Sequence, residues 1–124
     1  MDLRIDIELQ GELLLVTPSG NLAFDAGLRL LKLVCDTAKE KGVNKILVNG
    51  LAVGGELATL ERYRLGVEVA AYAKERQMNP RLAFVGKPPA MDGFGVRVGK
   101  NRGVTAEMFS TQQEALNWLE KRPS

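Results

Sequence analysis

Apolar and charged residues alternate strictly near the start of the chain, over residues 3–9 (LRIDIEL). This alternation predicts a half-buried β-strand with its apolar side chains on one face. A second apolar run, residues 13–20 (LLLVTPSG), follows after only three residues. The short connection predicts that the two strands form a hairpin.

After the predicted hairpin, the apolar residues have the spacing of an α-helix. Between Phe24 and Ala38, apolar residues recur every three or four positions, which predicts an amphipathic helix. Asp25 in its first turn and Lys41 in its last turn suit the helix dipole. Gly42 predicts a left-handed cap that ends the helix.

Two continuous apolar runs, residues 45–50 (KILVNG) and 81–86 (RLAFVG), predict strands that are buried on both faces. The segment between them predicts a second helix over residues 57–77, which ends before Pro80. The spacing of the residues in this helix predicts which ones share the face toward the core, namely Leu60, Tyr63, Val67, Ala70 and Ala73 or Lys74.

The last third of the chain predicts three further elements. A short helix is expected between Met91 and Gly103, with Asp92 as its N-cap. Three glycines in this segment each cost about 1 kcal/mol relative to alanine, so we expect it to be the least stable element. A strand over residues 104–109 and a helix capped by Thr111 complete the pattern.

The predicted order of elements is β-β-α-β-α-β-α-β-α. Strands that alternate with helices predict an α/β fold with a mostly parallel sheet and right-handed crossovers. The opening hairpin makes this sheet of four to five strands mixed, with helices packed around it. No linker, repeat or low-complexity tract divides the sequence, so we expect residues 1–124 to form a single domain.

The charge pattern does not favour nucleic-acid binding. Seventeen Lys and Arg residues oppose fifteen Asp and Glu, which gives a formal charge of +2. A nucleic-acid binder usually carries a basic stripe with interleaved aromatic residues. Here the only such group is thin and has Phe94 as its one aromatic neighbour; its members are Lys87, Arg97, Lys100 and Arg102.

The single cysteine and the lack of a long apolar stretch indicate in which cellular compartment the protein is expected. Cys35 lies among apolar residues, so we expect a small buried side chain in a reducing compartment. No apolar stretch approaches the ~20 residues that span a bilayer, and the alternating, acidic pattern of residues 1–10 predicts a strand and no signal peptide. The sequence therefore predicts a soluble, cytoplasmic protein without membrane insertion.

Candidate catalytic chemistry is sparse. The chain has no histidine, which removes the commonest general base and metal ligand. No cysteine cluster or paired carboxylates are apparent, and Cys35 on an apolar helix face is a poor nucleophile. We therefore expect no catalytic residues, no metal and no cofactor.

The segment between Asn49 and Thr59 leads from a predicted strand into a predicted helix. Gly54 and Gly55 would let backbone N–H groups converge with the helix start, forming an anion-binding site. The alternative is a tight turn in which Glu56 interacts with the helix dipole. The glycine spacing matches neither a P-loop nor a dinucleotide fingerprint.

Thr59 is a candidate phosphoacceptor at this helix start, because the helix dipole favours a phosphate there. Arg62 or Arg64 could then pair with the phosphate. The alternative is that Thr59 is an ordinary surface threonine.

Three sequences support a family resemblance: KILVNG leading through a loop into a helix, RLAFVG followed by a weak helix, and NRGVTAEMFSTQQEALNWL. Together with the element order, they resemble the STAS-domain superfamily, and within it the SpoIIAA-like (anti-sigma-factor antagonist-like) family. The resemblance implies a mixed sheet with helices around it and a function exerted by binding. It also implies a kinase-like protein or an anti-sigma factor as the partner.

In the family, a partner kinase phosphorylates a serine or threonine at the start of the helix after the third strand. The corresponding region here, NGLAVGGELATLER, has Asn49 near the usual aspartate and contains no serine. The resemblance therefore implies a regulatory, protein-binding domain that lacks the usual acceptor. Its expected contact residues are Asn49, Gly54, Gly55, Glu56, Thr59 and Arg62.

Two alternatives to a regulatory domain remain open. The first is a small-molecule or lipid-binding module, in which the weak helix between Met91 and Gly103 opens over a pocket. The second is a self-associating structural protein that forms a homodimer.

Overall fold

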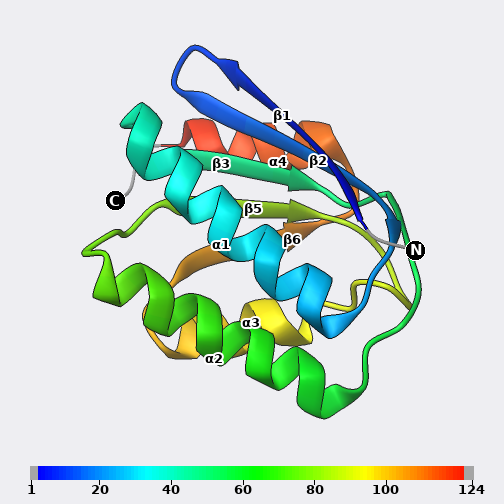
Figure 1. Cartoon of the computed structure of the whole chain (residues 1–124). Helices are drawn as coiled ribbons and strands as arrows, with labels where there is room; N and C mark the ends of the chain where they lie inside the picture. Colours follow the sequence, from blue (N-terminus) through cyan, green and yellow to red (C-terminus); the bar gives the residue numbers. More distant parts are fainter. Residues whose placement is uncertain (1–2, 122–124) are drawn as a thin grey trace.

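The computed structural model describes residues 3–121 and places four helices and six strands in that range (Figure 1). The bounds of the elements are β1 Arg4–Gln10, β2 Leu13–Asn21, α1 Phe24–Lys41, β3 Lys45–Asn49, β4 Ala52–Gly54, α2 Thr59–Glu75, β5 Arg81–Val85, α3 Phe94–Asn101, β6 Thr105–Phe109 and α4 Gln112–Glu120.

The strands form one sheet in the order β1-β2-β3-β5-β6. The hairpin strands β1 and β2 are antiparallel, and the remaining neighbours along this path are parallel. The predicted mixed, mostly parallel α/β sheet is thus confirmed. Strand β4 is an addition, because the sequence indicated only a loop there. It pairs in parallel with residues 19–21 at the end of β2.

Helices cover both faces of the sheet, in unequal number. Helices α1, α2 and α3 lie on one face, and α4 lies behind the sheet on the other (Figure 1). Alternate residues of β3 divide between the two cores: Ile46 and Val48 face α1, whereas Leu47 faces α4. This division explains why the KILVNG run is apolar at successive positions.

Two predicted helix ends are confirmed. Gly42 caps α1 in the left-handed conformation with φ 68°, and its N–H lies 3.2 Å from the Lys39 carbonyl oxygen. The Oγ1 of Thr111 accepts a hydrogen bond of 3.2 Å from the backbone N–H of Glu114 at the start of α4. Both signals are local, so the sequence alone was sufficient to find them.

The predicted orientation of α2 is wrong at two positions. Leu60 is 68% exposed and Tyr63 is 40% exposed, although both were expected to face the core. Ala70 and Ala73 are buried as predicted, and Gly66 and Val69 are buried with them. The helix turns small residues inward because it approaches its neighbours closely: a Cβ on Gly66 would lie 2.6 Å from the carbonyl oxygen of Gly95 in α3.

The start of α3 also differs from the prediction. Gly93, with φ 87°, is the N-cap residue instead of Asp92. The Asp92 carboxylate still accepts a hydrogen bond of 3.0 Å from the Phe94 N–H, so it caps the first turn from one position upstream. Met91 lies before the helix and packs on the core.

Cys35 is buried in α1, as predicted. Burial, reinforced by the nearby charge of Asp36, raises the pKa of its thiol to about 11. Along residues 3–121, no helix combines the length and apolar character needed to cross a bilayer.

Candidate functional site

The expected contact residues lie between the end of β3 and the first turn of α2, and Arg62 is the one that lies beyond the helix start. Asn49 ends β3, Gly54 and Gly55 lie at and just after β4, and Thr59 begins α2. The structure brings Gly54, Gly55, Glu56 and Thr59 together along one stretch of chain. Asn49 and Arg62 are directed elsewhere, toward α4 and toward the segment before α3.

Asn49 ties the segment to α4. Its Nδ2 donates a hydrogen bond of 2.7 Å to Oε1 of Gln112, and its Oδ1 accepts one of 3.1 Å from the Leu51 N–H. The second bond closes a turn directly after β3, a common role of an asparagine side chain. Both ends of the amide are therefore engaged within the fold.

Strand β4 and Gly55 fix the path of the loop toward α2. The carbonyl oxygen of Gly54 accepts a hydrogen bond of 2.9 Å from the Leu22 N–H. Gly55 adopts φ +92°, and a Cβ there would lie 2.8 Å from Oδ1 of Asn21 and 3.0 Å from the Leu22 carbonyl oxygen. A side chain at position 55 is thus disfavoured by the positive φ of the backbone and by the close atoms of Asn21 and Leu22.

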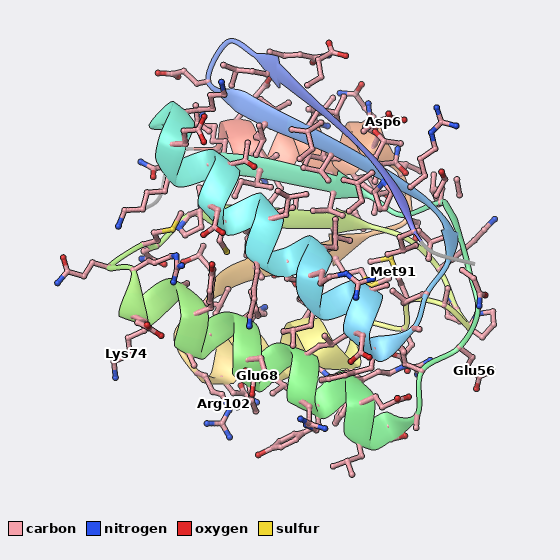
Figure 2. All side chains as sticks on the ribbon, viewed as in Figure 1. Asp6, Glu56, Glu68, Lys74, Met91 and Arg102 are labelled. Carbon is pink, nitrogen blue, oxygen red and sulfur yellow. The ribbon has the colours of Figure 1, made fainter. Side chains whose placement is uncertain are left out.

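The start of α2 carries negative charge. Ala58 is the N-cap residue and has no side chain that could cap the helix, but Oε1 of Glu61 accepts a hydrogen bond of 2.9 Å from its N–H. Glu56 is exposed on the loop just before the helix (Figure 2). Thr59 is exposed as the first helical residue, because α2 begins two residues later than predicted. A phosphate on Thr59 would therefore add negative charge to a helix start that already carries the carboxylates of Glu56 and Glu61.

Arg62 joins α2 to the segment before α3. Its Nη1 forms an ion pair with Oδ2 of Asp92, and its Nη2 donates a hydrogen bond of 2.7 Å to the Pro89 carbonyl oxygen. The side chain is only 13% exposed. Arg64, the other cation considered for a phosphate, stacks over the ring of Phe24 at 4.7 Å.

Three large side chains of this region are unusually exposed. Leu51 is 45% exposed after the turn at Asn49, and Leu60 and Tyr63 project from the first turns of α2. The hydroxyl oxygen of Tyr63 accepts a hydrogen bond of 3.0 Å from Nη2 of Arg102. Sequence reasoning did not name Leu51 as a contact residue, because its exposure follows from the turn that Asn49 closes and leaves no periodic pattern in the sequence.

Met91 was also missed as part of this region. It lies near the carboxyl ends of the strands (Figure 2), where glycines leave room for it. Its Sδ would lie 2.5 Å from a Cβ on either Gly50 or Gly86. These two glycines, which end the KILVNG and RLAFVG runs, therefore accommodate one side chain from a distant segment.

Comparison with solved structures defines the fold. No established sequence-family profile matches the chain, and no curated protein matches it significantly. The structure is similar to that of an anti-sigma factor antagonist from Mycobacterium paratuberculosis, with a TM-score of 0.66, 15% identity, and coverage of 97% of this chain and 96% of that one.

An uncharacterized protein from Shewanella loihica PV-4, described as having a SpoIIAA-like fold, is similar with a TM-score of 0.53 and 19% identity. The alignment covers 95% of this chain and 93% of that one. At these identities the likeness establishes the fold alone. The chain has a SpoIIAA-like fold, as its resemblance to that family implied.

Proposed function

We propose that this chain is a non-catalytic regulatory domain that binds a protein partner through residues 49–63, here called the contact segment. The observation that carries the proposal is the exposure of Leu51, Leu60 and Tyr63 within that segment. Large exposed apolar side chains are typical anchors of protein interfaces, and tyrosine is enriched among the residues that dominate binding energy.

The contact segment is held in place before any partner arrives. Asn49 fixes the turn that presents Leu51, and β4 pairs with β2. Arg102 holds the hydroxyl of Tyr63, and Arg62 ties the helix to the segment before α3. Ordering a surface during binding costs free energy, so a surface that is already ordered binds more tightly for the same contacts.

The fold suggests the kind of partner. The solved structure from Mycobacterium paratuberculosis is named an anti-sigma factor antagonist. By this likeness, an anti-sigma factor is the partner class that we propose, and a kinase-like protein is the partner class that the resemblance of the sequence to the SpoIIAA-like family implies. The non-catalytic part of the proposal is supported by the lack of histidine in the sequence and by the buried, protonated thiol of Cys35.

Thr59 is the proposed site of regulation on this surface. It is the one serine or threonine between residues 44 and 66, and it is exposed next to Leu60. A phosphate there would gain from the dipole of α2 but would add charge beside Glu61. Arg62 already pairs with Asp92, so the phosphate would act by blocking the apolar surface around Leu60.

Capture of partners from a lysate of the source organism, with quantitative mass spectrometry, tests the proposal. The informative variant is Leu60→Asp, and its matched control is Leu33→Asp, because Leu33 is a 42% exposed leucine on α1. We expect a stoichiometric partner that the wild type and Leu33→Asp retain and that Leu60→Asp and Thr59→Glu lose. Equal capture by all four proteins would contradict the proposal.

Light scattering on the same proteins separates partner binding from self-association. A wild-type dimer that Leu60→Asp converts to a monomer would assign the contact segment to a homodimer instead. A wild-type monomer that captures a partner through Leu60 would exclude that alternative.

A further inference from the structure

An apolar cavity of about 130 Å³ lies between the sheet and the helices α1, α2 and α3. Helices α1, α2 and α3 and strands β2 to β6 contribute to its lining, for example Leu30, Val48, Leu65, Val69, Phe84 and Val96. Helix α2 packs mainly on α1 and α3, and the cavity is lined by residues of α2 on one side and of β3 and β5 on the other.

The volume and lining restrict what could occupy this space. An engineered apolar cavity of about 150 Å³ stays dry and binds benzene, so this cavity has the capacity for a molecule of about that size. A charged ligand would lose its hydration without compensation against such a lining. The occupant is therefore small, uncharged and mostly apolar.

Arg62 and Asp92 are the two charged residues among those that line the cavity. They form an ion pair with each other, so their charges are already balanced. Two nitrogens of the Arg62 guanidinium have acceptors, namely Asp92 and the Pro89 carbonyl oxygen. The third, Nε, is buried and finds no acceptor among residues 3–121.

A buried N–H without an acceptor costs free energy, which a ligand can recover by supplying the acceptor. We propose that the cavity binds a small uncharged molecule that carries one hydrogen-bond acceptor, such as a ketone, aldehyde or ester, and that Nε of Arg62 donates to that acceptor. The apolar part of the molecule fills the space beneath α2. Arg62 belongs to the contact segment, but the exposed residues Leu51, Leu60 and Tyr63 do not line the cavity, so ligand binding there does not require a protein partner.

Two probes of nearly equal shape test the proposal, cyclohexanone with an acceptor oxygen and methylenecyclohexane without one. Methionine methyl groups report where each probe binds, in NMR spectra of protein labelled with ¹³C at these methyls. Met91 and Met108 line the cavity, whereas Met78 does not and serves as the internal control. Arg62→Lys keeps a cation for Asp92 and removes Nε, and Arg97→Lys at an exposed arginine is its matched control.

We expect both probes to shift the Met91 and Met108 signals and to leave Met78 unchanged. Cyclohexanone should bind about tenfold more tightly than methylenecyclohexane, as one hydrogen bond predicts. Arg62→Lys should abolish that preference, and Arg97→Lys should retain it. If Arg62→Lys does not fold, the ratio of the two probes' affinities for the wild-type protein decides whether Arg62 donates a hydrogen bond to the ligand.

Three results would overturn the proposal. No shift at Met91 and Met108 with either probe would show that the cavity does not bind ligands. Shifts of equal size at Met78 would show that binding is nonspecific. Equal affinity of the two probes for the wild type would show that Arg62 supplies no hydrogen bond to the ligand.

Discussion

The close contact between α2 and α3 depends on the absence of a side chain at position 66. A Cβ on Gly66 would lie 2.6 Å from the Gly95 carbonyl oxygen and 2.7 Å from Cβ of Val98. Both atoms belong to parts of α3 that cannot rotate away, so the helix itself would have to move. Overpacking of this kind costs up to about 3 kcal/mol, and the better helix propensity of alanine returns about 1 kcal/mol. Gly66→Ala should therefore lower the free energy of unfolding by about 2 kcal/mol.

Gly99→Ala is the matched control, because it makes the same substitution in a buried glycine of α3. A Cβ there would meet Cβ of Val104 at 3.7 Å, which is an ordinary contact. Only the propensity gain remains, so this variant should be more stable than the wild type by up to about 1 kcal/mol.

Urea unfolding measures both variants through the fluorescence of Trp118, the single tryptophan. The difference between the urea concentrations at the unfolding midpoints, multiplied by a slope m that both variants share, gives the change in the free energy of unfolding. If Gly66→Ala is as stable as Gly99→Ala, α2 and α3 leave room for a Cβ at position 66.

Substitutions at three further sites test the sheet, the buried thiol and the loop. Leu47→Ala, at a residue with 0% exposure, should cost about 2–5 kcal/mol in urea unfolding; a neutral result would contradict its place in the sheet. The Cys35 thiol, with its pKa raised to about 11 from 9.0, should resist thiol reagents at pH 8 until the protein unfolds. Because the unfolded thiol ionises first, stability should fall between pH 9 and 11, and Cys35→Ala should reduce that fall. Gly55→Ala should lower the free energy of unfolding, measured by thermal unfolding, by about 1–3 kcal/mol because of the positive φ of Gly55. Gly54→Ala should change this free energy far less, because a Cβ on Gly54 would lie 4.0 Å from its nearest neighbour, the Gly20 carbonyl oxygen.

Elements with local signals could be predicted from the sequence. The period between Phe24 and Ala38, together with Gly42, defines α1, and Thr111 followed by Glu114 defines the start of α4. The apolar runs define β3 and β5 because a strand buried on both faces needs no alternation. These features depend on neighbours in the sequence, and the overall fold follows from their order.

Features that depend on distant residues could not be predicted in the same way. Strand β4 forms because the backbone of residues 52–54 meets the end of β2, and its sequence, Ala-Val-Gly, has no strand pattern. Apolar residues lie on several sides of α2, so periodicity could not show that Gly66 faces inward. The glycines of α3 indicated weakness, but Gly95 lies against α2, where its small size permits the contact.

The candidate site shows the same limit. The residues of the segment after β3 could be identified by position, yet Arg62 and its partner Asp92 lie 30 residues apart in the sequence. An arginine on a helix surface has many possible acidic partners, and only the packing of α2 against α3 selects this one. The exposure of Leu60 was missed for the same reason, because it follows from the rotation of α2.

The pairing of β4 with β2 has a consequence for how binding specificity can change. Main-chain atoms hold residues 52–54 against residues 19–21, and main-chain hydrogen bonds do not depend on side-chain identity. Exposed positions such as Leu51, Glu56 and Leu60 can therefore be exchanged without displacing the loop that carries them. Randomised libraries at these positions would present varied recognition faces on one rigid frame, much as antibody loops do on their sandwich.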